Sequence, residues 1–291
     1  MEIAAAECHL SADNAWLRRA RVAKRMLDLQ WQNASATTPV AGGTGPDVSL
    51  TSYGRRLQTV HLTLESIGAG SLLPRRLILW LDDRGAARHP PPALRRLQTR
   101  GLEIRQVEDL GPHKKYFPYL LEVPLTGAMV TADDDVFYPR NWLSGLHTRY
   151  LEQPGCVHAY RAHIAAIDRN TNSFKPYGLW EPCRTKAPNR LHFSTGCSGV
   201  LFPVPVLEAL RRGGRGFLDC CPRADDVWLN LHAVRTGFPV AQVHEESLRF
   251  VGPLLTQGKG LFHQNLFSGG NDRALAATFN DTDMELLLAV S

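Results

Sequence analysis

The sequence contains no uninterrupted apolar run of the ~20 residues that a membrane-spanning helix needs. Residues 1–10 carry Glu2 and Glu7 and lack the charged-then-apolar pattern of a secretion signal. These absences predict a cytoplasmic protein without a transmembrane segment. They remain compatible with a peripheral contact at the inner face of the membrane.

Cysteine is also scarce, with 6 in 291 residues, and no two cysteines are separated by two residues. This spacing argues against a structural zinc site, and a chain of this length rarely depends on a disulfide framework. We therefore expect reduced thiols in a reducing compartment. The cysteines are Cys8, Cys156, Cys183, Cys197, Cys220 and Cys221.

A long run of basic residues is absent too, although the net charge is +5 and the isoelectric point is near 9.0. The basic residues occur mainly in short pairs without a nucleic-acid-binding motif, so nucleic acid is not an expected partner. A mild basic excess suits an anionic ligand such as a nucleotide phosphate. Arginine strongly outnumbers lysine, which is typical of a high-GC bacterial genome.

The chain divides into a short N-terminal segment and a larger domain. Residues 12–32 have apolar positions at helical spacing, whereas 33–47 are rich in small and turn residues. The glycines at 42–45 lack the Lys-Ser/Thr ending of a phosphate-binding loop. We expect residues 1–46 to form a helical segment and linker, suited to a homo-oligomer or membrane-surface contact. Residues 47–291 are long enough for one larger domain with its own core.

From residue 48 onward, strand and helix patterns alternate. The run 76–81 (RLILWL) is almost continuously apolar and is followed by Asp82 and Asp83, as expected for a buried parallel strand. The alternation predicts an α/β domain with a mostly parallel, Rossmann-type sheet flanked by helices, whose ligands collect at the carboxyl ends of the strands. The expected strands are 48–53, 76–81, 102–107 and 128–131, and the expected helices are 56–67, 92–100, 114–121 and 142–151.

The pattern loosens after residue 157. Residues 168–189 are polar and aromatic without periodicity, and a loop of that length is usually functional or mobile. Beyond Gly252 the chain is Gly-rich and polar until a final apolar helix. The other expected elements are a strand at 199–202, helices at 205–212 and 225–236, a strand near Val240 and the final helix at 283–290.

Three consecutive aspartates, Asp133, Asp134 and Asp135, follow an apolar strand. If the strand continues through them, alternation places Asp133 and Asp135 on one face, separated by roughly 6.6 Å of rise. Adjacent carboxylates repel one another unless a cation compensates, and Mg²⁺ and Mn²⁺ prefer carboxylate oxygens. A metal site therefore competes with the simpler interpretation of a turn.

Three further features favour the metal site. Asp225 and Asp226 open an amphipathic helix, where one Asp suffices as a cap and the second stays free for chemistry. Lys114 and Lys115 follow the third expected strand, where they can meet a diphosphate. His263 can add a neutral imidazole ligand, although a single His is more often structural.

The tripeptide His244-Glu245-Glu246 suggests a zinc hydrolase at first sight. The paired-His motif needs a second His at position 248, but this position holds Leu248. A zinc hydrolase is therefore not expected.

In their order along the chain these motifs resemble glycosyltransferases of the GT-A fold, which use nucleotide sugars. The matching segments are Asp-Asp-Asp-Val-Phe-Tyr-Pro-Arg-Asn-Trp-Leu (133–143), Gly-Cys-Ser-Gly-Val-Leu-Phe-Pro (196–203) and Asp-Asp-Val-Trp-Leu (225–229). The resemblance covers roughly residues 48–280. It implies a nucleotide-binding half at about 47–140 and an acceptor-binding half at about 141–291.

The resemblance also implies roles for individual residues. Asp135 and Asp133 of the Asp-x-Asp motif would bind Mn²⁺ or Mg²⁺, with His263 completing the metal shell. Asp226 would be the catalytic base, with Asp225 beside it. The implied acceptor-binding residues are Gly196, Cys197, Ser198 and Gly199. The implied donor-binding residues are Ser52, Tyr53, Arg55, Asp82, Lys114, Lys115, Asp133 and Asp134.

The expected activity is transfer of a hexose from a UDP- or GDP-sugar to a hydroxyl group of a glycan, glycolipid or small glycoside, as in polysaccharide biosynthesis. The departing diphosphate needs a metal ion and basic side chains to stabilise its negative charge. A sugar-phosphate or nucleotidyl transferase on the same fold, or a non-catalytic nucleotide-sugar-binding protein, is the alternative. The sequence leaves open whether the reaction inverts or retains the sugar configuration.

Overall fold

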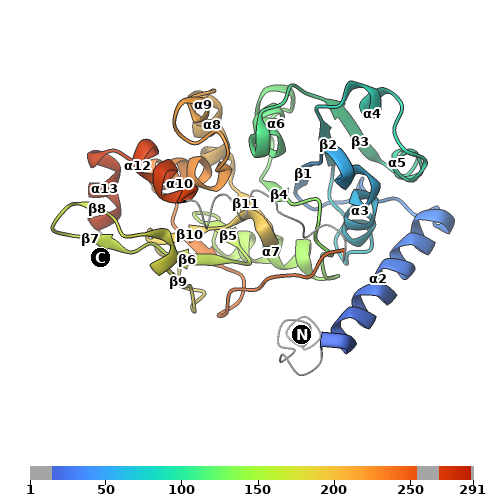
Figure 1. The fold of residues 1–291 in the computed structure, drawn as a ribbon, viewed down its shortest axis with the longest axis horizontal. Coiled ribbons are helices and arrows are strands. Elements are labelled where there is room, and N and C mark those ends of the chain that lie inside the picture. The colour runs from blue at the N-terminus through green and yellow to red at the C-terminus, as the bar shows by residue number, and fades with distance from the viewer. Residues whose placement is uncertain (1–14, 254–268, 290–291) are drawn as a thin grey trace.

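A seven-stranded sheet forms the centre of the molecule in the computed structural model, which describes residues 15–253 and 269–289. The strand order is β12-β5-β11-β4-β1-β2-β3, and Figure 1 shows helices flanking these strands. The strands are β1 (Asp47–Thr51), β2 (Leu77–Leu81), β3 (Leu102–Gln106), β4 (Met129–Ala132), β5 (Val157–Ala159), β11 (Val200–Phe202) and β12 (Val240–Gln242).

Within this sheet, only β11 runs against its neighbours. Strands β4, β1, β2 and β3 are parallel to one another, and β12 is parallel to β5. Because β11 is antiparallel to both β4 and β5, its first residue, Val200, lies at the edge where those two strands end. The expected mostly parallel α/β sheet flanked by helices is therefore confirmed.

Two hydrophobic cores cover the two faces of the sheet. Along β2, which is buried at every position, Ile78 and Trp80 enter one core, while Leu77, Leu79 and Leu81 enter the other. A strand between two apolar layers must be apolar throughout, which explains why the segment shows no polar alternation.

Helices from both halves of the chain form these layers. The core that holds Leu79 also contains side chains from α3, α5 and α7, and the core that holds Trp80 contains side chains from α6, α8, α10 and α12. The helices are α2 (Ala15–Ser35), α3 (Val60–Gly68), α4 (Arg84–Arg88), α5 (Pro92–Gln98), α6 (Phe117–Glu122), α7 (Trp142–Glu152), α8 (Val204–Gly213), α9 (Phe217–Cys220), α10 (Asp225–Arg235), α12 (Gly270–Thr278) and α13 (Asp281–Leu288).

Short elements complete the described chain. Strands β6, β9 and β10 form a three-stranded sheet, and β7 pairs with β8. These strands are β6 (Ala162–Ile164), β7 (Ile167–Asp168), β8 (Ser173–Phe174), β9 (Glu181–Pro182) and β10 (His192–Ser194). The 3₁₀ turns are η2 (Gly54–Gln58), η3 (Gly111–Lys115), η4 (Tyr177–Leu179) and η5 (Gly196–Ser198).

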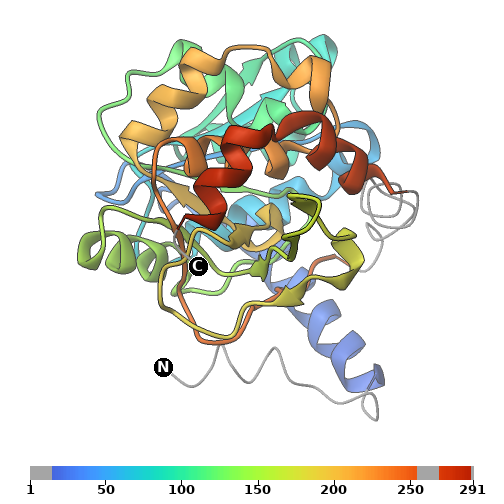
Figure 2. The ribbon, with the colours of Figure 1, turned by 90° about the vertical axis from the view of Figure 1, so that its left-hand side faces the viewer.

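The N-terminal helix α2 lies at one side of the molecule in both views (Figure 1 and Figure 2). Val22 and Leu29 on its inner face pack with Leu62 of α3 and with Phe137. Near the end of the helix, Asn33 donates to buried Glu65 at 2.9 Å. The expected helical appendage is thus present and is held by both apolar and polar contacts.

Several elements differ from the sequence expectations. The stretch 168–189, expected as one loop, contains the end of β7, the strands β8 and β9, and η4. Helix α12 lies where a Gly-rich polar tail was expected, and α13 begins at Asp281 because Asn280 and Asp283 form a capping box. Strands of two or three residues carry too few positions for a hydrophobic period, so the pattern cannot reveal them.

None of the described helices is long and apolar enough to span a bilayer. The cysteines within the described ranges are all free thiols.

Candidate active site

The carboxyl ends of β1, β2 and β4 meet at one edge of the sheet, because β1 is parallel to both neighbours. Ser52 follows β1, Asp82 follows β2 and Asp133 follows β4. Turn η5 reaches the same edge, because it leads into the antiparallel strand β11. This edge is where ligands bind in open α/β sheets.

The three aspartates lie in a turn just beyond the last residue of β4. The expectation from strand alternation is therefore wrong, because the strand does not continue through them. Asp133 lies 2.8 Å from the Nζ atom of Lys115. Asp134 and Asp135 instead lie 2.6 and 3.1 Å from the guanidinium group of Arg56. The turn thus directs its carboxylates toward two different cations.

Hydrogen bonds from neighbouring elements hold this turn. Ser52 at the end of β1 donates to the Asp134 carboxylate at 2.6 Å, and Thr63 of α3 donates to the Asp134 carbonyl oxygen at 2.9 Å. The hydroxyl of Tyr138 accepts the amide hydrogen of Asp133 at 2.9 Å. Asp134 is therefore a buried anchor of the turn, whereas its two neighbours are less buried.

Lys115 is a buried cation at the centre of the site. Its ammonium group lies 2.8 Å from Asp133 and 3.0 Å from Asp225. Ser49 of β1 donates to its carbonyl oxygen at 2.7 Å, which fixes η3 over the sheet. Burial alone lowers the pKa of Lys115, but three surrounding carboxylates outweigh this effect and raise it well above its ordinary value. Lys115 therefore stays charged and connects the acidic turn to α10.

Asp225 and Asp226 occupy the first turn of α10, whose N-cap is Ala224 without a side-chain capping bond. The expectation that one of them serves as the cap is therefore wrong, and both carboxylates are available to the site. Asp226 accepts the amide hydrogen of Gly196 at 3.0 Å. The hydrogen bond joins α10 to η5.

The two adjacent carboxyl groups differ in their proton affinity. Burial raises the pKa of Asp225, but the charge of Lys115, with a smaller effect from His113, outweighs burial and lowers it below the ordinary value. Burial, followed by repulsion from Asp225, raises the pKa of Asp226 to about 8. Neighbouring acids with pKa values pushed apart are a recurrent acid–base arrangement in enzymes. Asp226 is thus a group that can take up a proton near neutral pH.

Asp133 and Asp135 have the chemistry that a hard divalent cation requires. Burial, followed by the charge of Asp133, raises the pKa of Asp135 to about 6, as expected for carboxylates that repel one another. Their side chains remain 26% and 25% exposed, so both can accept a further ligand. Mg²⁺ and Mn²⁺ need few protein ligands when water and substrate phosphates complete the shell.

The protein ligands for such an ion are incomplete in the described part of the chain. Within residues 15–253 and 269–289, no three His, Cys, Asp or Glu side chains are grouped in a way that could hold a metal ion. His263, the expected third ligand, lies outside the described residues. The carboxylates of the two aspartates suit a divalent metal ion, and the remaining metal ligands stay a prediction.

Lys114 and Tyr53 lie on the β2 side of the site. The buried ammonium group of Lys114 pairs with Asp82 and lies 2.7 Å from Asp109, so its charge is balanced within the protein. Two cations approach the Tyr53 ring, with Lys114 at 6.0 Å and Arg56 at 5.5 Å from its centroid. Because Tyr53 is exposed, its ring can stack against a ligand.

Two glycines let the backbone approach the site closely. A Cβ atom on Gly196 would lie 3.0 Å from the Asp226 carboxylate and 3.3 Å from the ammonium group of Lys115. Gly199 has a φ angle of +90°, and a Cβ atom there would lie 2.6 Å from the Trp142 ring. Larger residues would therefore displace the catalytic candidates or strain the turn.

Between these glycines, Cys197 and Ser198 have different environments. Ser198 is buried and donates to the Leu248 carbonyl oxygen at 2.7 Å, which is a structural contact. The thiol of Cys197 is partly exposed and lies 3.8 Å from Arg161. Arg161 also donates to Thr195 at 2.8 Å. The Cys197 side of η5 is therefore the side that a ligand can reach.

Arg56 is a site residue that was not expected from the sequence. The expected donor-binding residue was its neighbour Arg55. Arg55 is exposed, and across the described ranges it forms no side-chain hydrogen bond or ion pair. A 3₁₀ turn has three residues per turn, so two consecutive side chains face different directions. Adjacent arginines carry no signal in the sequence that identifies which one faces the aspartates.

Tyr177 was missed as well, and it belongs to the stretch 168–189. Burial raises the pKa of its phenol, and the negative charge of Asp226 raises it further. Its ring centroid lies 4.8 Å from that of Trp180 and 5.7 Å from that of His163. The aromatic content of this stretch is the sequence signal that pointed to it, but no pattern distinguished Tyr177.

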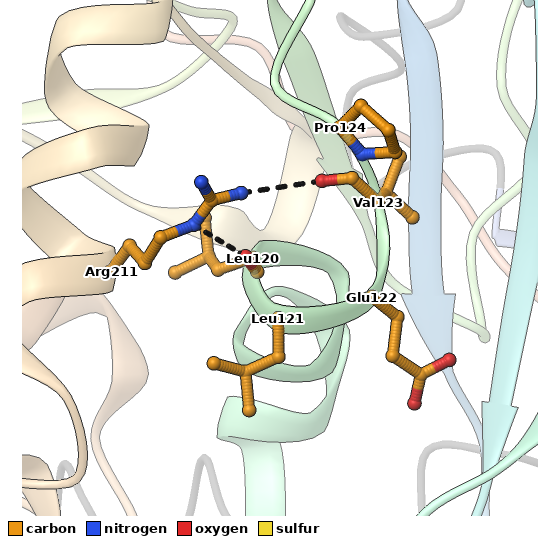
Figure 3. A pocket seen from close by; sticks show the side chains of 6 residues that line it. All are labelled: Leu120, Leu121, Glu122, Val123, Pro124 and Arg211. Carbon is orange, nitrogen blue, oxygen red and sulfur yellow. Dashed lines mark hydrogen bonds between the residues drawn. The ribbon is translucent and has the colours of Figure 1, made fainter.

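A hollow of about 370 Å³ lies elsewhere on the surface, between α6 and α8 (Figure 3). Arg211 of α8 donates there to the carbonyl oxygens of Leu120 and Val123, at 2.6 and 3.3 Å. These bonds satisfy carbonyl groups at the end of α6. The hollow contains none of the aspartates of the sheet edge and is separate from the candidate site.

Comparison with known proteins identifies the fold but not a family. No protein-family model matches the sequence, and no curated protein sequence matches it. Among solved structures, the chain is similar to mannosyltransferase PcManGT from Pyrobaculum calidifontis in complex with GDP-Man and Mn²⁺. The TM-score is 0.52 at 15% identity, and the match covers 93% of this chain and 77% of the other.

A second similar structure is GalNAc-T7 with UDP, GalNAc and Mn²⁺, with a TM-score of 0.51 at 12% identity. That match covers 74% of this chain but only 45% of the other, so this chain spans less than half of GalNAc-T7. Both structures are of sugar transferases with a nucleotide ligand and Mn²⁺. The GT-A-like fold that the sequence motifs implied is therefore confirmed.

Proposed function

We propose that the protein is a metal-dependent glycosyltransferase that moves a hexose from a nucleoside-diphosphate sugar to a hydroxyl group. One observation carries this proposal. Lys115 contacts both Asp133 of the acidic turn and Asp225, and the residue next to Asp225 is the proton acceptor Asp226. A proton acceptor and a cation-binding turn thus share one edge of the sheet. The shared fold with two nucleotide-bound sugar transferases supports the proposal.

The donor would lie along the carboxyl ends of β1, β2 and β4. Tyr53 and Asp82 would border the nucleoside, and Arg56 would lie near its diphosphate as a planar cation. A UDP- or GDP-sugar is the proposed donor class. GDP-Man and UDP are the nucleotide ligands of the two similar structures.

Asp133 and Asp135 would hold Mn²⁺ or Mg²⁺, with His263 as a further ligand. When bound, the ion supplies charge neutralisation to the departing diphosphate. The protein's own part is to orient the two carboxylates. Arg56 performs this for Asp135 at 3.1 Å, and Lys115 performs it for Asp133 at 2.8 Å.

Asp226 would act as the base toward an acceptor that approaches over residues 196–199. The acceptor oxygen forms a bond to the anomeric carbon of the sugar, and the bond from that carbon to the diphosphate oxygen breaks. The hydroxyl proton passes to the Asp226 carboxylate, and the bonding electrons leave with the nucleoside diphosphate. A single displacement of this kind inverts the configuration at the anomeric carbon.

Lys115 and Asp225 would support this step without touching the reacting atoms. The ammonium group of Lys115 keeps Asp225 ionised, and the adjacent negative charge raises the proton affinity of Asp226. The amide of Gly196 holds the Asp226 carboxylate toward η5. The arrangement therefore gives one ionised acid and one proton acceptor at neighbouring positions.

Replacing Asp135 by Ala is expected to weaken Mn²⁺-dependent donor binding at least about tenfold, because the variant loses a metal-binding carboxylate. A thermal-shift screen of UDP- and GDP-sugars with and without Mn²⁺ would first identify the donor. Calorimetry would then compare the wild type, Asp135→Ala and the control Asp28→Ala, in which an exposed surface carboxylate is removed. Equal donor affinity in wild type and Asp135→Ala would refute the metal assignment.

Product identification would test the reaction type. Release of free nucleoside diphosphate, rather than a phosphate-linked sugar, would exclude a sugar-phosphate transferase and a nucleotidyl transferase.

The pH dependence of transfer is a second test of the proposed base. A base must be ionised to accept a proton, and the raised pKa of Asp226 keeps this carboxyl group protonated below about 8. We therefore expect kcat/KM to rise as the pH increases through this range, since kcat/KM reports groups of the free enzyme. Steady-state rates over a pH series would show the rise. A flat profile in this range would contradict the assignment.

A further inference from the structure

Helix α2 carries an unusually exposed apolar stripe. Trp16 is 75% exposed, Leu27 is 67% exposed and Trp31 is 74% exposed. Their spacings of 11 and 4 residues correspond to about three turns and one turn of helix, so they share one face. The packed face of the same helix is different, since Val22 and Leu29 contact the body of the protein. The outward stripe is therefore not needed for attachment of α2.

The same helix is also strongly basic. The helix contains five basic residues and a single acidic residue, Asp28, which lies 2.8 Å from Lys24. The helix has 21 residues and is therefore roughly 30 Å long. The two tryptophans of the outward stripe lie near its two ends. The basic residues are Arg18, Arg19, Arg21, Lys24 and Arg25.

We infer that α2 is a docking surface for an anionic lipid bilayer. Helices that lie in the membrane interface combine a Trp- and Leu-bearing face with Lys and Arg, and tryptophan favours the headgroup level. Anionic headgroups complement the basic side chains. A second copy of the chain complements them poorly, because two α2 helices would bring like charges together.

Attachment of α2 gives the docked protein a defined orientation. Phe137, which packs in the same cluster as Val22, follows Asp135 by two residues. At the other end of the helix, Asn33 and Arg100 both bond to the buried carboxylate of Glu65. These contacts keep α2 from moving independently of the sheet.

Vesicle binding by the full chain tests the inference without any need for transferase activity. Vesicles of phosphatidylcholine with added phosphatidylglycerol are expected to sediment with the protein, and neutral phosphatidylcholine vesicles are expected to retain much less. Trp16→Ala/Trp31→Ala should reduce binding to anionic vesicles by more than about tenfold, because the apolar anchors are lost. Leu151→Ala, which removes a 66% exposed apolar side chain from α7, should leave binding unchanged.

Tryptophan fluorescence offers a second readout. The other tryptophans, Trp80, Trp142, Trp180 and Trp228, are buried, so a blue shift on addition of anionic vesicles would come from α2. This shift should disappear in the double variant and weaken at high salt. Absence of binding in the wild type, or equal binding by a folded double variant, would overturn the inference. A concentration-dependent dimer that is lost in the double variant, without vesicle binding, would assign the stripe to a second copy instead.

Discussion

Asn in place of Asp226 is expected to lower the rate of sugar transfer by about 10²–10⁴-fold, the range over which a general base usually contributes. The amide oxygen of Asn can still accept the Gly196 hydrogen bond that Asp226 accepts at 3.0 Å. It cannot take up the proton of the acceptor hydroxyl. Single-turnover rates with a saturating donor would measure the loss.

Donor binding should survive this change, because Asp226 lies on α10 and not in the acidic turn. Asp219→Asn is a matched control, since it makes the same chemical change at an exposed position on α9. The Asp226→Asn variant should also be at least as stable as the wild type, because burial disfavours the charged form of Asp226. Near-normal turnover in Asp226→Asn would remove this residue from the catalytic set.

Met in place of Lys115 is expected to destabilise the folded protein by about 3–5 kcal/mol. The substitution keeps an apolar stem of similar length but removes the ammonium group that lies 2.8 Å from Asp133 and 3.0 Å from Asp225. Asp225 is then left buried without its main compensating charge. Urea unfolding of the variant and the wild type would give the difference in free energy of unfolding.

A second substitution distinguishes electrostatics from packing in this experiment. Lys115→Met/Asp225→Asn removes both charges of the 3.0 Å pair and should recover a large part of the lost stability. Lys24→Met is the control for loss of a lysine, because Lys24 is 77% exposed and its pair with Asp28 contributes little. A double variant as unstable as Lys115→Met would show that the ammonium group does not stabilise the fold through Asp225.

Local patterns predicted every strand of the central sheet except β5. The run 76–81 became β2, which is apolar because it lies between two hydrophobic layers. The positions of the acidic turn and of the Asp225-Asp226 pair also agree with the expected ends of their elements. These features depend on residues close together in the chain, where periodicity carries the information.

The conformation of the acidic turn could not be predicted from the sequence. A strand through Asp133 and Asp135 would have placed both carboxylates on one face, but the chain turns after β4. Hydrogen bonds from Ser52 and Thr63, which lie on other elements, hold the turn in place. Short-range patterns contain no information on those partners.

The sequence by itself determined the layered α/β architecture, because burial on both faces of a sheet requires apolar strands and flanking amphipathic helices. Only the tertiary structure decided which charges meet. It selected Arg56 over Arg55 for the acidic turn, and it placed Lys115 between Asp133 and Asp225. The physical reason is that an ion pair depends on distance and direction in space, and residues from separate elements acquire both only when the sheet brings those elements to one edge.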